Sequence, residues 1–143
     1  MRIYLFQHGM SGQNPAVPES LRGALIRTAS QTDTKSLVVA VYLMPDPRLT
    51  RGVYYRRWLN PAHFVASRGH WALSKHFAIP RDLPDRFRLI RMRLDPECPY
   101  PRTERDTYGW EFVYPRFLDH AALLFAHELH HFRRYHLDLH PRE

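Results

Sequence analysis

The longest continuous hydrophobic pattern in the chain is SLVVAVYLM, an apolar and β-branched run at 36–44 that stops at Pro45. A short run of this kind, bounded by a turn residue, predicts a strand buried at the centre of a sheet. Shorter patterns with strand character lie on both sides of it, at 2–6, 53–58, 86–94 and 110–114. The pattern at 53–58 also fits an aromatic-rich loop, and both interpretations stay open here.

The segment RFRLIRMRL at 86–94 alternates arginines with apolar residues, as a β-strand does. Phe87 and Leu89 fall on one face, whereas Met92 and Leu94 are out of phase with that pair. A β-bulge inserts one extra residue and would restore the register. We therefore expect a bulge near Ile90.

Two segments have apolar positions at helical spacing. The first is 19–30, where Pro18 suits a first turn and apolar residues recur every three or four positions. The second is 115–139, which opens with Pro115 and has a middle, 121–126, that is apolar on every side. A helix that is apolar all round is typical of the interior of a domain, so we expect the second helix to be buried.

The remaining segments have weaker patterns. The stretch 62–77 has a weak helical pattern, and the charged, proline-rich stretch 95–109 reads as a loop. The resulting order is strand, helix, strands and a final buried helix. This order predicts an α+β fold in which a small twisted sheet is packed with helices.

Composition and charge narrow the class of protein. The 143 residues are 44% hydrophobic and 13% aromatic, which is typical of one folded domain, so we expect a single domain over 1–143. The formal charge is +7 and the pI is about 10.0. A strongly basic chain favours acidic partners such as nucleic acid or an acidic protein surface.

The arginines of the 86–94 segment are the candidate basic surface. A strand would show them largely on one face: Arg86, Arg88, Arg91 and Arg93. Together with exposed aromatic residues, they would form a stacking and phosphate-binding surface for single-stranded nucleic acid. The competing interpretation is a solvated sheet face that arginine keeps soluble.

The single cysteine, Cys98, excludes an intrachain disulfide and a cysteine-cluster zinc site. No apolar run approaches the length of a membrane span, and the apolar start of the chain is too short for a secretory signal. We therefore expect a cytoplasmic protein without a membrane partner.

The candidate chemistry lies in the final helix, which contains His127-Glu128-Leu129-His130-His131, an H-E-x-x-H pattern. Positions i and i+4 of a helix lie on one face, so the imidazoles of His127 and His131 can bind one Zn²⁺. Glu128 is placed to take a proton from a metal-bound water as a general base. A chance match is the alternative, since the chain has ten histidines.

The stretch LFAHELHHF resembles the active-site helix of the zincin metallopeptidases, over about the last thirty residues. The resemblance implies that His127 and His131 are zinc ligands and that Glu128 is the catalytic acid and base. It also implies that the helix packs under a small sheet whose edge strand binds the substrate backbone in extended form. Arg133 departs from the uncharged residues that the family prefers around the motif.

A catalytic zinc site needs a third protein ligand, and subclasses of the family place it differently. Metzincin-like families have a histidine and a preceding glycine where this chain has Leu137 and Arg134, so the likeness does not extend to them. SprT-like proteases use a later loop histidine beside Gly or Pro, and His140 has a similar setting. Gluzincin-like and ImmA/IrrE-like proteins use a downstream acidic ligand, a role that Glu143 would fill.

Helix geometry limits these choices. If the helix ran unbroken to Asp138, His140 would lie roughly 13 Å along the axis from His131. His140 is therefore a ligand only if the helix ends near Arg134 and the chain folds back. The third ligand would otherwise be a residue beyond a C-terminal truncation or one of three loop histidines, His63, His70 and His76.

Other polar residues have less specific patterns. His136 and His130 point away from the ligand face and are expected at the surface. His120 stands two turns before His127, too far to share an ion, and either packs in the core or lines a substrate cleft. The candidate donors to an oxyanion are three tyrosines, Tyr108, Tyr114 and Tyr135.

The sequence thus predicts a small α+β zinc metallopeptidase that hydrolyses polypeptides, with His127, His131 and His140 as metal ligands and Glu128 as general base. Two alternatives remain. One is a non-enzymatic basic module that binds nucleic acid or a protein partner. The other is a degenerate zincin that lacks its last ligand.

Overall fold

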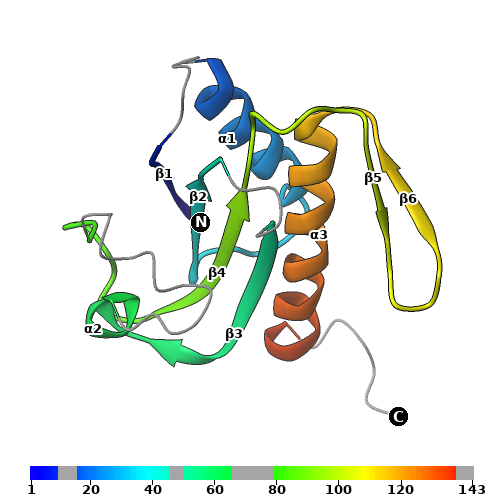
Figure 1. Ribbon diagram of the computed structural model, residues 1–143. Coiled ribbons are helices and arrows are strands. Elements are labelled where there is room, and N and C mark those ends of the chain that lie inside the picture. Colours follow the sequence, from blue (N-terminus) through cyan, green and yellow to red (C-terminus); the bar gives the residue numbers. More distant parts are fainter. Residues whose placement is uncertain (10–15, 46–49, 66–78, 138–143) are drawn as a thin grey trace, which may run out of the picture.

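The computed structural model describes residues 1–9, 16–45, 50–65 and 79–137 of the chain. Their elements are β1 (Arg2–Gln7), α1 (Ala16–Thr28), β2 (Leu37–Leu43), β3 (Arg51–Leu59), α2 (Pro61–Val65), β4 (Phe87–Leu94), β5 (Arg102–Arg105), β6 (Glu111–Tyr114) and α3 (Phe117–His136) (Figure 1). The prediction of a mixed α and β architecture with a small sheet is confirmed.

The main sheet has four strands in the order β1-β2-β4-β3. β1 and β4 both pair with β2 in parallel, whereas β3 pairs with β4 in antiparallel orientation and forms an edge of the sheet. The predicted buried central strand at 36–44 is β2, and every one of its residues is buried. The segment 53–58, left open between strand and loop, belongs to β3.

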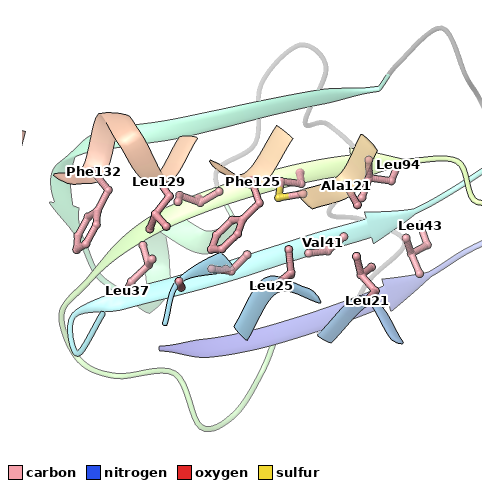
Figure 2. Packing of buried hydrophobic residues seen from close by; sticks show 14 residues of the cluster. Leu21, Leu25, Leu37, Val41, Leu43, Leu94, Ala121, Phe125, Leu129 and Phe132 are labelled. Carbon is pink, nitrogen blue, oxygen red and sulfur yellow. The ribbon is translucent and has the colours of Figure 1, made fainter. Parts of the chain in front are cut away.

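Helices α1 and α3 lie side by side over one face of this sheet (Figure 1). Their apolar stripes meet above β2 and β4 to form the larger hydrophobic cluster (Figure 2). α3 contributes Ala121, Phe125, Leu129 and Phe132 to the cluster, and α1 contributes Leu21 and Leu25. The opposite face of the sheet has a smaller cluster, closed by Phe64 of α2.

Strand β4 contains no bulge near Ile90, so that expectation is wrong. Its register with β2 is continuous from end to end. Phe87 and Leu89 pack in the smaller cluster, whereas Ile90 and Met92 pack in the larger one. The change of phase arises because β4 is buried on both faces, and a strand of this kind needs no strict alternation. The register shift in the sheet lies instead in β3, between Tyr55 and Leu59.

The stretch 95–109, expected to be a loop, contains β5, which pairs with β6 in an antiparallel hairpin. The hairpin stands beside α3, away from the main sheet (Figure 1). Its turn is held by Asp106, whose Oδ1 accepts hydrogen bonds from the backbone N–H groups of Tyr108 and Trp110, both at 2.9 Å. Gly109 supplies the positive φ of +86° that the turn requires.

Helix α3 confirms the longest predicted helix over most of its length. It begins at Phe117, two residues later than expected from Pro115, and continues to His136. The first turn is supported by an ion pair between Arg116 and Asp119 at 3.1 Å. The part of the prediction after Leu137 lies outside the described residues, and so does 66–77 of the predicted 62–77 helix, where only α2 is described.

Within the ranges described here, no helix is long and apolar enough to cross a membrane.

The fold predicts that α3 is held mainly by its buried stripe. Phe125 is 0% exposed at the centre of the larger cluster, so we expect Phe125→Ala to lower the free energy of unfolding by about 3–5 kcal/mol. Leu123 is 50% exposed on the same helix, and Leu123→Ala should cost no more than about 0.5 kcal/mol. Urea denaturation measures both. Equal costs would show that the packing of α3 is described wrongly.

Candidate metal and catalytic site

The imidazole rings of His127 and His131, both on α3, point toward each other. Their Nε2 atoms lie 3.3 Å apart, and their ring planes are nearly perpendicular. Two imidazole nitrogens on one tetrahedral zinc ion, each bonded at 2.0–2.1 Å, are separated by about 3.3–3.4 Å. The observed spacing therefore suits a shared ion without any rotation of the helix. The His127 side chain is 67% exposed, so such an ion would lie at the solvent boundary.

The electrostatics keep His131 in the form that binds a metal. Burial lowers the pKa of its imidazole, and the nearby positive charges of His127, His130 and Arg134 lower that pKa further. A neutral imidazole has a free lone pair, whereas the protonated ring has none to give a metal.

Glu128 lies beside the histidine pair but is turned into the protein. The residue is 6% exposed, and its Oε1 is 3.9 Å from Nε2 of His127. Burial raises the pKa of the Glu128 carboxyl, against the opposing influence of His127. A carboxylate that is partly desolvated and close to the Nε2 atom of His127 has the basicity that a general base beside a metal ion on this histidine would need.

A glycine of the edge strand permits this burial of Glu128. A Cβ atom on Gly52 of β3 would lie 2.9 Å from Cγ of Glu128 and 3.2 Å from Cδ1 of Leu124. Any side chain on residue 52 would therefore push the carboxylate or the helix away. No local pattern in the sequence marks Gly52, because its role depends on a contact between segments far apart in the chain.

No third candidate ligand joins the histidine pair among the described residues. Over the ranges that the structure covers, no group of three His, Cys, Asp or Glu side chains is arranged to hold an ion. His63 lies in α2, where its Nδ1 accepts a hydrogen bond from the backbone N–H of Asn60 at 3.1 Å. The other candidates, His70, His76, His140 and Glu143, lie outside the described residues.

The remaining histidines of α3 divide by the surface they face. His130 is exposed, as expected. The expectation of a surface position for His136 is wrong, because α3 packs on β3 there and the His136 ring contacts Tyr54, with centroids 5.5 Å apart. Its Nε2 is buried and has no hydrogen-bond partner within the described part of the chain. Burial lowers the pKa of His136 accordingly.

Two hollows flank the histidine pair. The larger, about 600 Å³, lies between α3 and the β5–β6 hairpin, and its lining includes Glu104, Phe112, His120, Leu123 and His127. The smaller, about 310 Å³, lies between α3 and β3 and is lined by Gly52, Val53, Tyr54, Arg56, Glu128, His131 and Tyr135. The edge strand β3 thus runs along the same groove that Glu128 and His131 face.

A polar network around His120 forms part of the wall of the larger hollow. The Tyr100 hydroxyl lies 2.9 Å from Nδ1 of His120, and Glu104 lies 3.6 Å from Nε2 and 3.0 Å from Arg102. Burial raises the pKa of Tyr100 to about 12, so its hydroxyl stays protonated beside Nδ1. Burial lowers the pKa of His120, and Tyr114 stacks on its ring. His120 is therefore buried, in line with the expected core position, and it also lines the larger hollow.

Of the three candidate tyrosines, only Tyr135 lies beside both Glu128 and His131. Tyr108 is 87% exposed at the hairpin turn, and Tyr114 is stacked on His120. The Tyr135 ring stacks against His131, with centroids 6.3 Å apart. The spacing of four residues from His131 to Tyr135 is the sequence signal that distinguishes this tyrosine, because residues four apart share a helix face.

The proposed arginine surface of β4 is wrong for two of its four residues. Arg91 and Arg93 are 2% and 4% exposed, and Arg91 donates a hydrogen bond to the backbone oxygen of Phe64 at 2.6 Å. They are buried because β4 is an inner strand covered on both faces. Arg86 and Arg88 do reach the surface region, where both guanidinium groups stack on Trp58 at 4.2 and 3.9 Å. Nucleic-acid binding by this reduced pair stays a prediction.

In comparisons with known proteins, the chain matches no family model, no curated protein and no solved structure.

The contact between Gly52 and Glu128 is directly testable. Because an added Cβ would overlap Cγ of Glu128, Gly52→Ala should lower the free energy of unfolding by about 1–3 kcal/mol. In a Glu128→Ala background, which removes that Cγ, the same substitution should cost clearly less. Urea denaturation of the four proteins gives the coupling. An equal cost in both backgrounds would contradict the close approach of β3 and α3 at this point.

Proposed function

We propose that the protein is a zinc-dependent metallopeptidase of the zincin type. The observation that carries the proposal is the convergence of His127 and His131 beside the buried carboxylate of Glu128, under the edge strand β3. Each of these features has a separate physical cause. The helix spacing brings the two imidazoles together, and the packing of α3 on the sheet buries the carboxylate. Their combination is what metal-assisted hydrolysis requires.

When bound, Zn²⁺ supplies a Lewis acid that lowers the pKa of a water to about 7 and polarises a substrate carbonyl. Glu128 takes the proton as the water attacks, and then delivers it to the leaving amine. The raised pKa of this carboxyl favours the second step, because a weaker acid holds the proton until the amine needs it. Tyr135 lies beside His131, and its proposed role is to donate a hydrogen bond to the developing oxyanion.

The edge of β3 suits an extended peptide substrate. An edge strand presents backbone N–H and C=O groups that pair with an added strand. The smaller hollow lies along this edge beside Glu128, and the larger one lies beside His127, so the side chains next to the cleaved bond would enter them. The larger hollow has apolar walls in Phe112, Leu123 and Leu124, which suit an apolar side chain.

His140 is the proposed third ligand, with Glu143 as the alternative. The helix continues to His136, two residues past the end near Arg134 that the sequence argument required for a return of His140. That expected end is wrong, and His136 lies about 7.5 Å along the axis from His131. The four residues from there to His140 span up to about 13 Å when extended, so the chain is long enough to return to the metal position.

The first experiment measures metal content. The purified protein should hold one zinc ion per chain by elemental analysis, and His127→Ala and His131→Ala should each release it. His130→Ala is the matched control, because His130 is exposed on another face of the same helix and should leave zinc unchanged. Wild-type protein without stoichiometric zinc would refute the proposal. Salt-dependent DNA binding that persists in His127→Ala would instead favour a non-enzymatic basic module.

The second experiment measures hydrolysis. Glu128→Gln keeps the size of the side chain but removes the base, so the zinc-loaded variant should retain its metal and lose about 10²–10⁴-fold in kcat. Cleavage of a degenerate decapeptide library, followed by mass spectrometry, supplies the measurement. Unchanged hydrolysis in Glu128→Gln would show that another group is the base.

A further inference from the structure

We propose that this site selects acidic peptides, through Arg56 of β3, which binds a substrate carboxylate next to the cleaved bond. The inference rests on the proposed peptidase function and specifies its substrate class. Arg56 lines the smaller hollow together with Glu128 and His131, so any group bound by Arg56 lies within the same groove as the proposed reaction centre.

The Arg56 guanidinium is held in place by an aromatic ring. Its central carbon lies 4.0 Å from the centroid of the Tyr135 ring, and Tyr135 in turn stacks on His131. A guanidinium stacked on a ring face loses little hydrogen-bonding capacity, because its N–H groups point outward in its own plane. That planar fork matches the two oxygens of a carboxylate, which it binds with two parallel hydrogen bonds.

The positive charge of Arg56 is not neutralised by an acid within the described residues. The ion pairs found there join other partners, and the backbone oxygen of Arg56, not its guanidinium, accepts a hydrogen bond from Arg88 at 2.9 Å. Glu128 is the one acidic residue in the lining of the smaller hollow, and it is buried against Gly52. An anionic substrate group would therefore gain a partner on binding.

The surroundings of the smaller hollow add to its positive field. Arg51 is exposed on the same strand, and Arg134 is exposed on α3 with its guanidinium 5.9 Å from the Tyr135 centroid. The formal charge of the whole chain is +7. Such a field attracts an acidic segment and repels a basic one before contact is made. We therefore infer that the site selects peptides by their charge and that Arg56 binds the substrate carboxylate.

The carboxylate has two sources in a peptide: an Asp or Glu side chain, or the free C-terminus. The experiment uses three degenerate decapeptide libraries that distinguish them. One is amidated and contains Glu, the second is amidated and contains Gln in its place, and the third contains Gln and a free C-terminus. Hydrolysis by the zinc-loaded protein and retention on its Glu128→Gln variant are both measured, so binding is scored without turnover.

Arg56→Gln is the test variant and Arg57→Gln is its matched control. The two residues are adjacent and exposed, but Arg57 lies on the other side of the strand, close enough to Tyr55 to oppose the rise in pKa that burial gives that hydroxyl. Both variants remove one positive charge from β3. A general effect of charge would therefore appear equally in both, whereas a bound carboxylate depends on Arg56 alone.

We expect the wild type to prefer one of the carboxylate libraries over the amidated Gln library by about 10- to 100-fold, the range of a charge-assisted hydrogen bond. Arg56→Gln should abolish this preference and Arg57→Gln should keep it. Preference for the Glu library identifies a side chain, and preference for the free C-terminus identifies a terminal carboxylate; either result supports the inference.

Three results would overturn it. Hydrolysis of all three libraries at equal rates would refute selection by a carboxylate and leave the peptidase function standing. Equal losses in both variants would reduce the preference to general charge. Tighter binding of a single-stranded oligonucleotide, lost in Arg56→Gln, would assign Arg56 to a phosphate. If no library is hydrolysed, the peptidase proposal fails by itself, and retention on the Glu128→Gln variant still decides whether Arg56 binds a carboxylate.

Discussion

The close packing of α3 against the edge strand β3 is the contact on which the site depends. Gly52 makes it possible, because any Cβ there would lie 2.9 Å from Cγ of Glu128. The same contact sets how deeply Glu128 is buried and thereby raises the pKa of its carboxyl. It also brings Arg56 of β3 over Tyr135 of α3. One interface thus places the proposed base, the strand edge that would hold a peptide, and the cation that would read its charge.

Helix α3 has one side that stabilises the fold and another that carries the candidate site residues. One side is the apolar stripe that includes Phe125 and Phe132 and anchors the helix in the larger core cluster. The other carries His127, His131 and Tyr135 at intervals of four residues, so their rings form a row along the groove. Because the buried stripe fixes the rotation of the helix, the row cannot turn away without loss of core packing. The rigidity that a metal site needs therefore comes from hydrophobic burial on the opposite side.

The β5–β6 hairpin is held to α3 in a different way. It shares no strand with the main sheet, and its link to the helix is the network of Tyr100, Glu104 and His120, supported by stacking of Tyr114 on the His120 ring. A buried polar network of this kind is specific in geometry, since each member needs its partners. The hairpin forms the outer wall of the larger hollow, and so its attachment sets the shape of the space beside His127.

Patterns within one segment were readable from the sequence, because helix and strand periods act over a few residues. They predicted the buried strand β2, the course of α3 and the convergence of His127 and His131. They failed wherever distant segments meet. The arginines of β4 suggested a surface, but Arg91 and Arg93 are buried because an inner strand is covered on both faces. Gly52 and Arg56 lie more than seventy residues before Glu128, so only the packing of β3 on α3 could bring them to the site.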